Sequence, residues 1–277
     1  MSSQTVTTAP STAPSSAPNT ELTSRLFWAL SDSLTLVGRS TRKGLRSLDA
    51  LLTAVLLPVM LLLMFVYVFG GAIHTGTSYI DYVVPGIILL CAGFGSASVS
   101  SSVCEDMTSG AIDRFRSMPI VSSAVLTGNV IAGMIRNVIS TLLVLAVALV
   151  IGFHPTAGIL GWLGVLGMLL LFMAAISWLA ACFGLIARTA EAANAFTFIV
   201  MFLPYVSSAF IPTRTMPRGL RAFATHQPVT PIIETVRGLL TGTPIGGDAV
   251  TALAWCIGGI VLGCAGATLL FRRRTAP

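Results

Sequence analysis

Charged side chains gather in one segment of the sequence, residues 105–119 (EDMTSGAIDRFRSMP), which separates two long apolar stretches. Carboxylates and guanidinium groups at this density suit ion pairs with another protein, and the apolar side chains between them could anchor such a contact. Gly110 permits a tight bend, and Pro119 would end a helix. The pattern predicts a short helical segment that a soluble partner can hold. An ordinary solvated loop is the alternative that these residues leave open.

Residues that usually carry catalysis or bind metals are not grouped. His74, His154 and His226 lie far apart, without histidine or cysteine neighbours at ligand spacing, so we expect no metal site. The five cysteines form no CxxC pair and are expected to be buried thiols. The only lysine, Lys43, lies in RSTRKGLRS rather than in a GxxxxGK[ST] phosphate loop. The chain is therefore not expected to bind ATP by that route or to be an enzyme.

The composition is that of an integral membrane protein. Of 277 residues, 55% are hydrophobic and only 9% are charged, and the mean hydropathy is +0.88. This is too little polar surface to cover a water-soluble globule. The apolar stretches are continuous rather than alternating, which predicts helices and an all-α polytopic fold.

Six stretches are candidates for crossing a hydrocarbon layer of about 30 Å. They cover approximately residues 51–69, 83–103, 130–153, 159–187, 195–210 and 250–271. The fifth is short for a full crossing. The second carries Gly86, Gly93 and Gly95 with several serines, so close packing against a second copy of the chain is expected, and lining a transport path is the alternative.

Basic residues predict the orientation. They precede the first stretch, follow the second, fourth and sixth, and are absent from residues 70–82 and 154–158. Both termini are therefore expected in the cytoplasm. The exception is the connection before the last stretch, which contains Arg214, Arg218, Arg221 and Arg237.

Two further regions flank this core. Residues 1–20 are rich in Ser, Thr, Ala and Pro and are expected to form a disordered cytoplasmic tail. Apolar residues recur at helical spacing in residues 21–48, which predicts an amphipathic helix on the inner membrane surface. A helix packed on the protein's own cytoplasmic face is an equal alternative.

The segment 211–243 holds repeated prolines and two short helical stretches, around residues 220–223 and 232–240. Each is too short to cross the bilayer. Irregular backbone at membrane depth must be buried in protein or line a cavity, so a re-entrant hairpin entering from outside is predicted. A structured external loop resting on the headgroups is the alternative.

No carboxylate falls inside the predicted spans; the acidic residues lie at or beyond their ends. A carrier driven by ions usually needs an ionisable group within the membrane. The energy source is therefore expected to be a separate subunit.

Two motifs point to one family. Glu105, Gly110, Asp113 and Pro119 stand in the order E-x4-G-x2-D-x5-P after the second span. Before the last span come SAFIP, MP, QPVTP and ETVRG, at residues 208–212, 216–217, 227–231 and 234–238. Over nearly all of residues 20–274 the chain resembles the ABC type-2 exporter permeases, and within them the daunorubicin-resistance type.

The resemblance implies roles for particular residues. The segment 104–121 would couple the permease to a separate ATPase. Independently of the resemblance, Arg188 and Glu191 could pair at i,i+3 spacing and make a second, smaller ATPase contact; a helix-end pair at the membrane surface is an equal alternative. The coupling residues are then Glu105, Asp106, Gly110, Asp113, Arg114, Phe115, Arg116, Pro119, Arg188 and Glu191. The external re-entrant gate would comprise Pro212, Pro217, Pro228, Glu234 and Arg237.

The expected function is that of a six-span transmembrane domain, residues 49–274, in the bacterial plasma membrane. Two copies with two ATPase subunits would export an amphipathic, drug-like natural product through a path at the dimer interface. ATP and Mg²⁺ would bind the ATPase, this chain would hold no cofactor, and nucleic acid is not an expected partner. A lipid or lipid-linked glycan is the alternative cargo. An ion-driven carrier and a lipid-modifying membrane enzyme are the alternatives of other classes, disfavoured by the missing intramembrane acid and the missing catalytic set.

Overall fold

The computed structural model describes residues 48–73, 78–108 and 122–275 of the chain. The predicted tail, the predicted amphipathic helix up to residue 47, and Gly110, Asp113, Arg114, Phe115, Arg116 and Pro119 lie outside the described residues. Every regular element in the described part is a helix. In chain order these are α2 (Leu48–Leu63), the π-helix η1 (Met64–Phe69), α3 (Tyr79–Ala97), α4 (Val99–Thr108), α6 (Ser122–Ile151), α7 (Ile159–Ile186), α8 (Ala190–Tyr205), the 3₁₀ helix η2 (Thr213–Thr215), α9 (Arg218–His226), α10 (Val229–Thr241) and α11 (Asp248–Thr275).

Each predicted apolar stretch coincides with a helix, with ends that differ by up to eight residues, as where α6 begins at Ser122 rather than at residue 130. Four are long and apolar enough to cross a membrane: α3 with α4 (Tyr79–Thr108), Leu126–Ile151 of α6, α7, and Asp248–Phe271 of α11. Two apolar helices are shorter, Val55–Phe69 and Ala190–Tyr205. The predicted all-helical, polytopic architecture is confirmed. The prediction that the fifth stretch is short is also confirmed.

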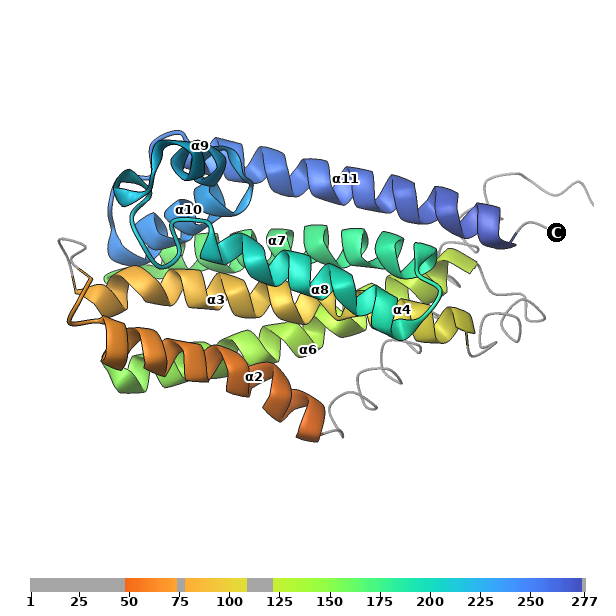
Figure 1. Ribbon diagram of the computed structural model, residues 1–277, viewed down its shortest axis with the longest axis horizontal. Helices are drawn as coiled ribbons and strands as arrows, with labels where there is room; N and C mark the ends of the chain where they lie inside the picture. Colours follow the sequence, from red (N-terminus) through yellow and green to blue (C-terminus); the bar gives the residue numbers. More distant parts are fainter. Residues whose placement is uncertain (1–47, 74–77, 109–121, 276–277) are drawn as a thin grey trace, which may run out of the picture.

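The long helices lie side by side in one elongated bundle (Figure 1). Helices α3 and α4 follow each other with only Ser98 between them. The end of η1, the start of α3 and the connection from α6 to α7 lie at one end with α9 and α10. The end of α4, the turn from α7 to α8 and the end of α11 lie at the other. The two predicted sets of connections are therefore separated in space.

The α3–α4 helix forms the centre of the bundle. Of its most apolar stretch, 83% is buried within the chain, against 17% for α11. Helices α2, α6, α7, α8 and α10 all pack against it. The outer helices turn their apolar side chains outward, as expected where the surroundings are lipid.

Small residues allow this dense packing. A Cβ at Gly86 would lie 2.7 Å from the Cβ of Ala209, and one at Gly95 would overlap the amide of Asn137. One at Gly184 of α7 would overlap the carbonyl oxygen of Ser100. The expectation that the small residues of the second span serve a second copy is wrong for Gly86 and Gly95, because other segments of the same chain already cover them.

Two glycines four residues apart bring α11 against α7. A Cβ at Gly263 would lie 2.7 Å from the Cβ of Trp178 and 2.9 Å from its carbonyl carbon, and one at Gly259 would lie 3.2 Å from the Cβ of Ala175. This is the GxxxG spacing that lets two membrane helices touch along their backbones. The contact between α7 and α11 is the most extensive in the described bundle.

Polar side chains join α6 to α3 near the middle of the bundle. The Nδ2 atom of Asn137 donates to the carbonyl of Ala92 at 2.6 Å and to the hydroxyl of Ser96 at 2.8 Å. The preceding residue, Arg136, donates to the hydroxyl of Ser98, which lies between α3 and α4, at 3.2 Å. Such bonds between helices fix their register where water is scarce.

The Gly184 contact yields a stability prediction. We expect Gly184→Ala to lower the free energy of unfolding by about 2 kcal/mol, because the new methyl group meets the backbone of Ser100, which cannot rotate away. Gly167→Ala in the same helix is the matched control, since a Cβ there has nothing within 4 Å and alanine favours helix. Thermal unfolding of the purified protein in detergent compares the two. Equal melting temperatures would contradict the packing described.

Candidate functional site

Helix α4 is bonded to the turn between α7 and α8 and to the first turns of α8. The hydroxyl of Ser100 donates to the carbonyl of Ala193 at 2.9 Å, and the hydroxyl of Ser101 donates to the side-chain oxygen of Asn194. The thiol of Cys104 lies 3.7 Å from the carbonyl of Ala187. These contacts hold the first half of α4 and the start of α8 as one unit.

The first part of α6 joins the same unit. The Nδ2 atom of Asn129 donates to the Oδ2 atom of Asp106 at 2.6 Å. A hydrogen bond to a carboxylate is stronger than one between neutral groups. We call residues 100–108, Asn129 and residues 187–194 the α4 platform.

The α4 platform presents charged side chains to solvent. Glu105, Arg188 and Glu191 are exposed, whereas Asp106 is half-buried in its bond to Asn129. Of the predicted coupling residues, these four are described, and the structure brings them to the same end of the bundle.

Arg188 and Glu191 do not form the ion pair that their spacing suggested; no ion pair joins them in the described structure. The reason lies in the backbone, because Ala187 and Thr189 are extended and helix α8 begins only at Ala190. The i,i+3 geometry of a helix therefore does not apply. Thr189 instead caps α8, its hydroxyl oxygen accepting from the amide of Ala192 at 3.2 Å.

At the opposite end, the three predicted gate prolines each begin a short helix. Pro212 precedes η2, Pro217 precedes α9 and Pro228 precedes α10. Proline suits the start of a helix because its missing N–H would have no partner there. The two predicted short helices of this segment are thus confirmed as α9 and α10, and α10 is buried against α3, α7 and α11.

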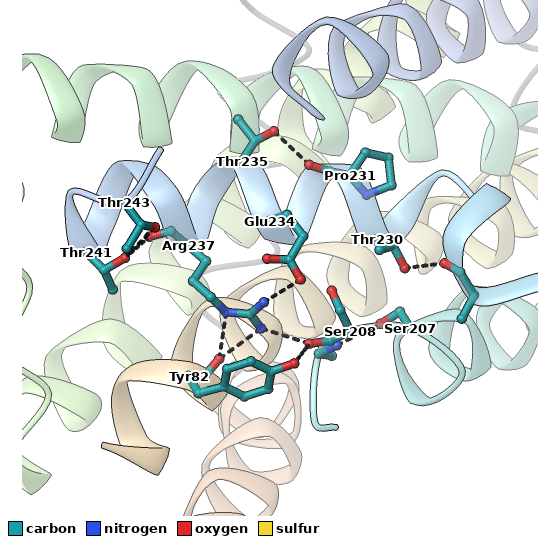
Figure 2. Close-up of polar contacts among 12 residues, drawn as sticks. Tyr82, Ser207, Ser208, Thr230, Pro231, Glu234, Thr235, Arg237, Thr241 and Thr243 are labelled. Carbon is teal, nitrogen blue, oxygen red and sulfur yellow. Dashed lines mark hydrogen bonds and ion pairs between the residues drawn. The ribbon is translucent and has the colours of Figure 1, made fainter. Parts of the chain in front are cut away.

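Glu234 and Arg237 project from α10 into a polar cluster (Figure 2). Arg237 is only 8% exposed. Its Nη1 atom lies 2.7 Å from the Oε1 atom of Glu234. Its Nη2 atom donates to the carbonyls of Tyr82 at 3.0 Å and Ser208 at 2.8 Å. A charge this deeply buried is stable only when it is paired and hydrogen-bonded, as it is here.

Tyr82 completes the cluster. The guanidinium carbon of Arg237 lies 3.8 Å from the centre of the Tyr82 ring, and the Tyr82 hydroxyl donates to the carbonyl of Ser208 at 2.9 Å. A cation over an aromatic face adds further attraction. We call Tyr82, Ser208, Glu234 and Arg237 the Arg237 cluster. It joins the first turn of α3, the connection after α8, and α10.

The connection after α8 is itself buried. The Phe210 ring stacks on Phe65 at 4.2 Å and on Tyr205 at 5.1 Å between ring centroids. The side chain of Gln227 donates to the carbonyl of Val206 at 2.7 Å, which satisfies backbone left open at the end of α8. The chain between α8 and η2 therefore closes this end of the bundle against η1 and α3.

The sequence did not identify Tyr82, Asn129 or Ser208 as site residues. A tyrosine at the start of a span usually signals an interfacial anchor, and Ser208 contributes its backbone carbonyl, which no side-chain pattern reveals. Asn129 lies one residue before the predicted start of its span, and only the fold shows that it reaches Asp106.

The comparisons with known proteins agree on one family. Residues 32–241 match the model of the ABC-2 type transporter family. The chain is similar to the daunorubicin resistance ABC transporter permease protein DrrB1 of Streptomyces coeruleorubidus, with 30% identity over 78% of this chain and 77% of the relative. It is also similar to the probable doxorubicin resistance ABC transporter permease protein DrrC of Mycobacterium tuberculosis, with 25% identity over 85% of each. The chain thus belongs to the ABC-2 type transporter family, whose members are membrane permease components.

Proposed function

We propose that this chain is the permease subunit of an ATP-driven exporter that moves an amphipathic, drug-like molecule out of a bacterial cell. A separate ATPase would supply the energy and hold the ATP and Mg²⁺. The drug-resistance names of the relatives support this class of cargo. The observation that carries the proposal is the α4 platform, where exposed charges stand on a firmly bonded surface at the end of the central helix.

The proposed coupling runs through α3 and α4. An ATPase that binds Glu105, Arg188 and Glu191 would push on residues bonded to one another across α4, α6 and α8. The α3–α4 helix has 30 residues and is therefore about 45 Å long. At its other end Tyr82 contacts Arg237. Movement at the platform would thus reach the Arg237 cluster along one helix.

The proposed transport path lies between two copies of the chain. The central helix is packed on its sides by helices of its own chain, which supports a path outside the single unit rather than through it. We assign six spans to each copy by adding α2 with η1 and α8 to the four long helices. Both termini would be cytoplasmic, and two copies would bind two ATPase subunits.

The Arg237 cluster is the proposed closure of the external end. Helix α10, the connection after α8 and α3 meet there, and opening the path would require their bonds to separate. The buried α10 and its proline-initiated start support a re-entrant arrangement of this segment.

Transport by membrane vesicles that contain the chain and its ATPase tests the cargo. ATP-dependent uptake of an anthracycline by inverted vesicles is expected. Movement of a labelled lipid or lipid-linked glycan without any drug uptake would support the alternative cargo. Uptake that persists without ATP and stops with an uncoupler would indicate an ion-driven carrier and contradict the proposal.

The proposed coupling role predicts that removing the negative charge of Glu105 weakens transport. Glu105→Gln should reduce ATP-dependent transport roughly tenfold or more, because a hydrogen bond to a charged group is worth about 1.5–3 kcal/mol. The melting temperature should hardly change, since Glu105 is exposed. Asp248→Asn, an exposed acid at the opposite end, is the matched control and should transport normally. Full transport by Glu105→Gln would rule out this contact.

The closure role predicts a graded loss of stability. Arg237→Gln should lower the free energy of unfolding by about 2 kcal/mol or more, because the carbonyls of Tyr82 and Ser208 and the Glu234 carboxylate lose their buried donor. Glu234→Gln should cost less, since Arg237 keeps both carbonyls. Passive leak of cargo without ATP should rise with Arg237→Gln.

Ser208→Ala is the control for that series. Only the carbonyl of Ser208 bonds Arg237, and its buried hydroxyl has no hydrogen-bond partner among the described residues. The variant should be as stable as the parent in thermal unfolding. If Arg237→Gln and Ser208→Ala had the same melting temperature and the same rate of passive leak, the proposed closure at the Arg237 cluster would be contradicted.

A further inference from the structure

Helix α9 is short and largely exposed. It has nine residues, and only Ala224 is buried. It contacts α10 and η2, while the long helices leave most of its surface uncovered. A hydrogen bond joins α9 to α10: the hydroxyl of Thr230 on α10 donates to the carbonyl of Ala224.

The side chains of α9 divide into two faces. Leu220 and Phe223 are three residues apart on one face and are 46% and 57% exposed. Arg218 and Arg221 are likewise three residues apart, on the opposite face, and both are exposed. An exposed apolar face opposite a basic face is typical of helices that lie in the interface of a membrane.

The positive charge of this region is uncompensated within the described chain. Arg214 in η2 is also exposed. None of Arg214, Arg218 and Arg221 forms an ion pair with a described residue, and the nearby Glu234 already pairs with Arg237. A partner that matches this surface must offer anionic groups to the three cations and an apolar layer to the adjoining face.

We propose that α9 lies in the headgroup layer of the membrane, with Leu220 and Phe223 among the acyl chains and Arg214, Arg218 and Arg221 bound to phosphates of anionic lipids. Lipid phosphate is the occupant that supplies both the negative charge and the adjoining hydrocarbon. This binding surface explains why basic residues gather in a connection where orientation by charge would not place them. It also holds the start of α10, through Thr230, at a fixed depth.

This inference goes beyond the proposed function, because it requires neither an ATPase nor a cargo. The test uses the full chain with its five cysteines replaced, reconstituted in vesicles of phosphatidylglycerol and phosphatidylcholine. An environment-sensitive fluorophore is attached at Phe223→Cys or, on the polar face, at Thr225→Cys. The probe at 223 should be shifted to the blue and quenched by spin-labelled lipid. The probe at 225 should be quenched by aqueous iodide.

A second arm tests the charges. Each basic residue near an anionic surface favours association roughly fivefold. Replacing Arg214, Arg218 and Arg221 by glutamine should therefore reduce the preference of the 223 probe for spin-labelled phosphatidylglycerol over phosphatidylcholine at least roughly tenfold. Replacement of all three by lysine should retain most of it. Arg273→Gln, an exposed arginine at the other end, should leave it unchanged.

Three results would overturn the proposal. A 223 probe that iodide quenches freely would place α9 in water. A 223 probe shielded from both quenchers would place this face against protein, such as a second copy of the chain. A 223 probe with the same preference in the glutamine variant would show that the arginines do not select anionic lipid.

Discussion

Close contact between helix backbones is the constraint on which the rest of this structure depends. Between helices in an apolar layer, association rests on packing and hydrogen bonds rather than on the expulsion of water. Small residues provide that contact, as where Gly184 meets Ser100 and Gly263 meets Trp178. Because α7 can lie directly on α4, the hydroxyl of Ser100 also reaches the backbone at the start of α8. The packing of the interior thus determines where the charged surface stands.

The two ends of the central helix differ in chemistry. At one end, the guanidinium of Arg237 is buried and satisfied by Glu234 and backbone carbonyls, which joins three segments. At the other end, Glu105 and its charged neighbours face solvent on a bonded platform. A buried, satisfied charge resists separation, whereas an exposed charge is available to a partner. One end therefore holds three segments together, and the other leaves its charges accessible.

The sequence predicts the helices well because continuous hydrophobic runs indicate the helices, and glycine and proline indicate where helices begin or end. It also predicts the two short helices of residues 211–243, since prolines begin them. It does not predict how the helices pack: Gly86 and Gly95 contact their own chain, and the bond of Asn129 to Asp106 joins residues 23 apart. Backbone acceptors such as the Ser208 carbonyl leave no trace in a side-chain pattern. The prediction that Arg188 pairs with Glu191 is wrong because the turn is extended.

The central claim, that a separate ATPase seats on the α4 platform, is tested most directly by site-specific cross-linking in cells. A photoreactive amino acid replaces Glu105 in one variant and Asp248, at the opposite end, in another. The account predicts that irradiation joins the 105 variant to a protein that mass spectrometry identifies as a phosphate-loop ATPase, and that the 248 variant gives no such product. An ATPase cross-linked equally from both positions, or from neither, would contradict it.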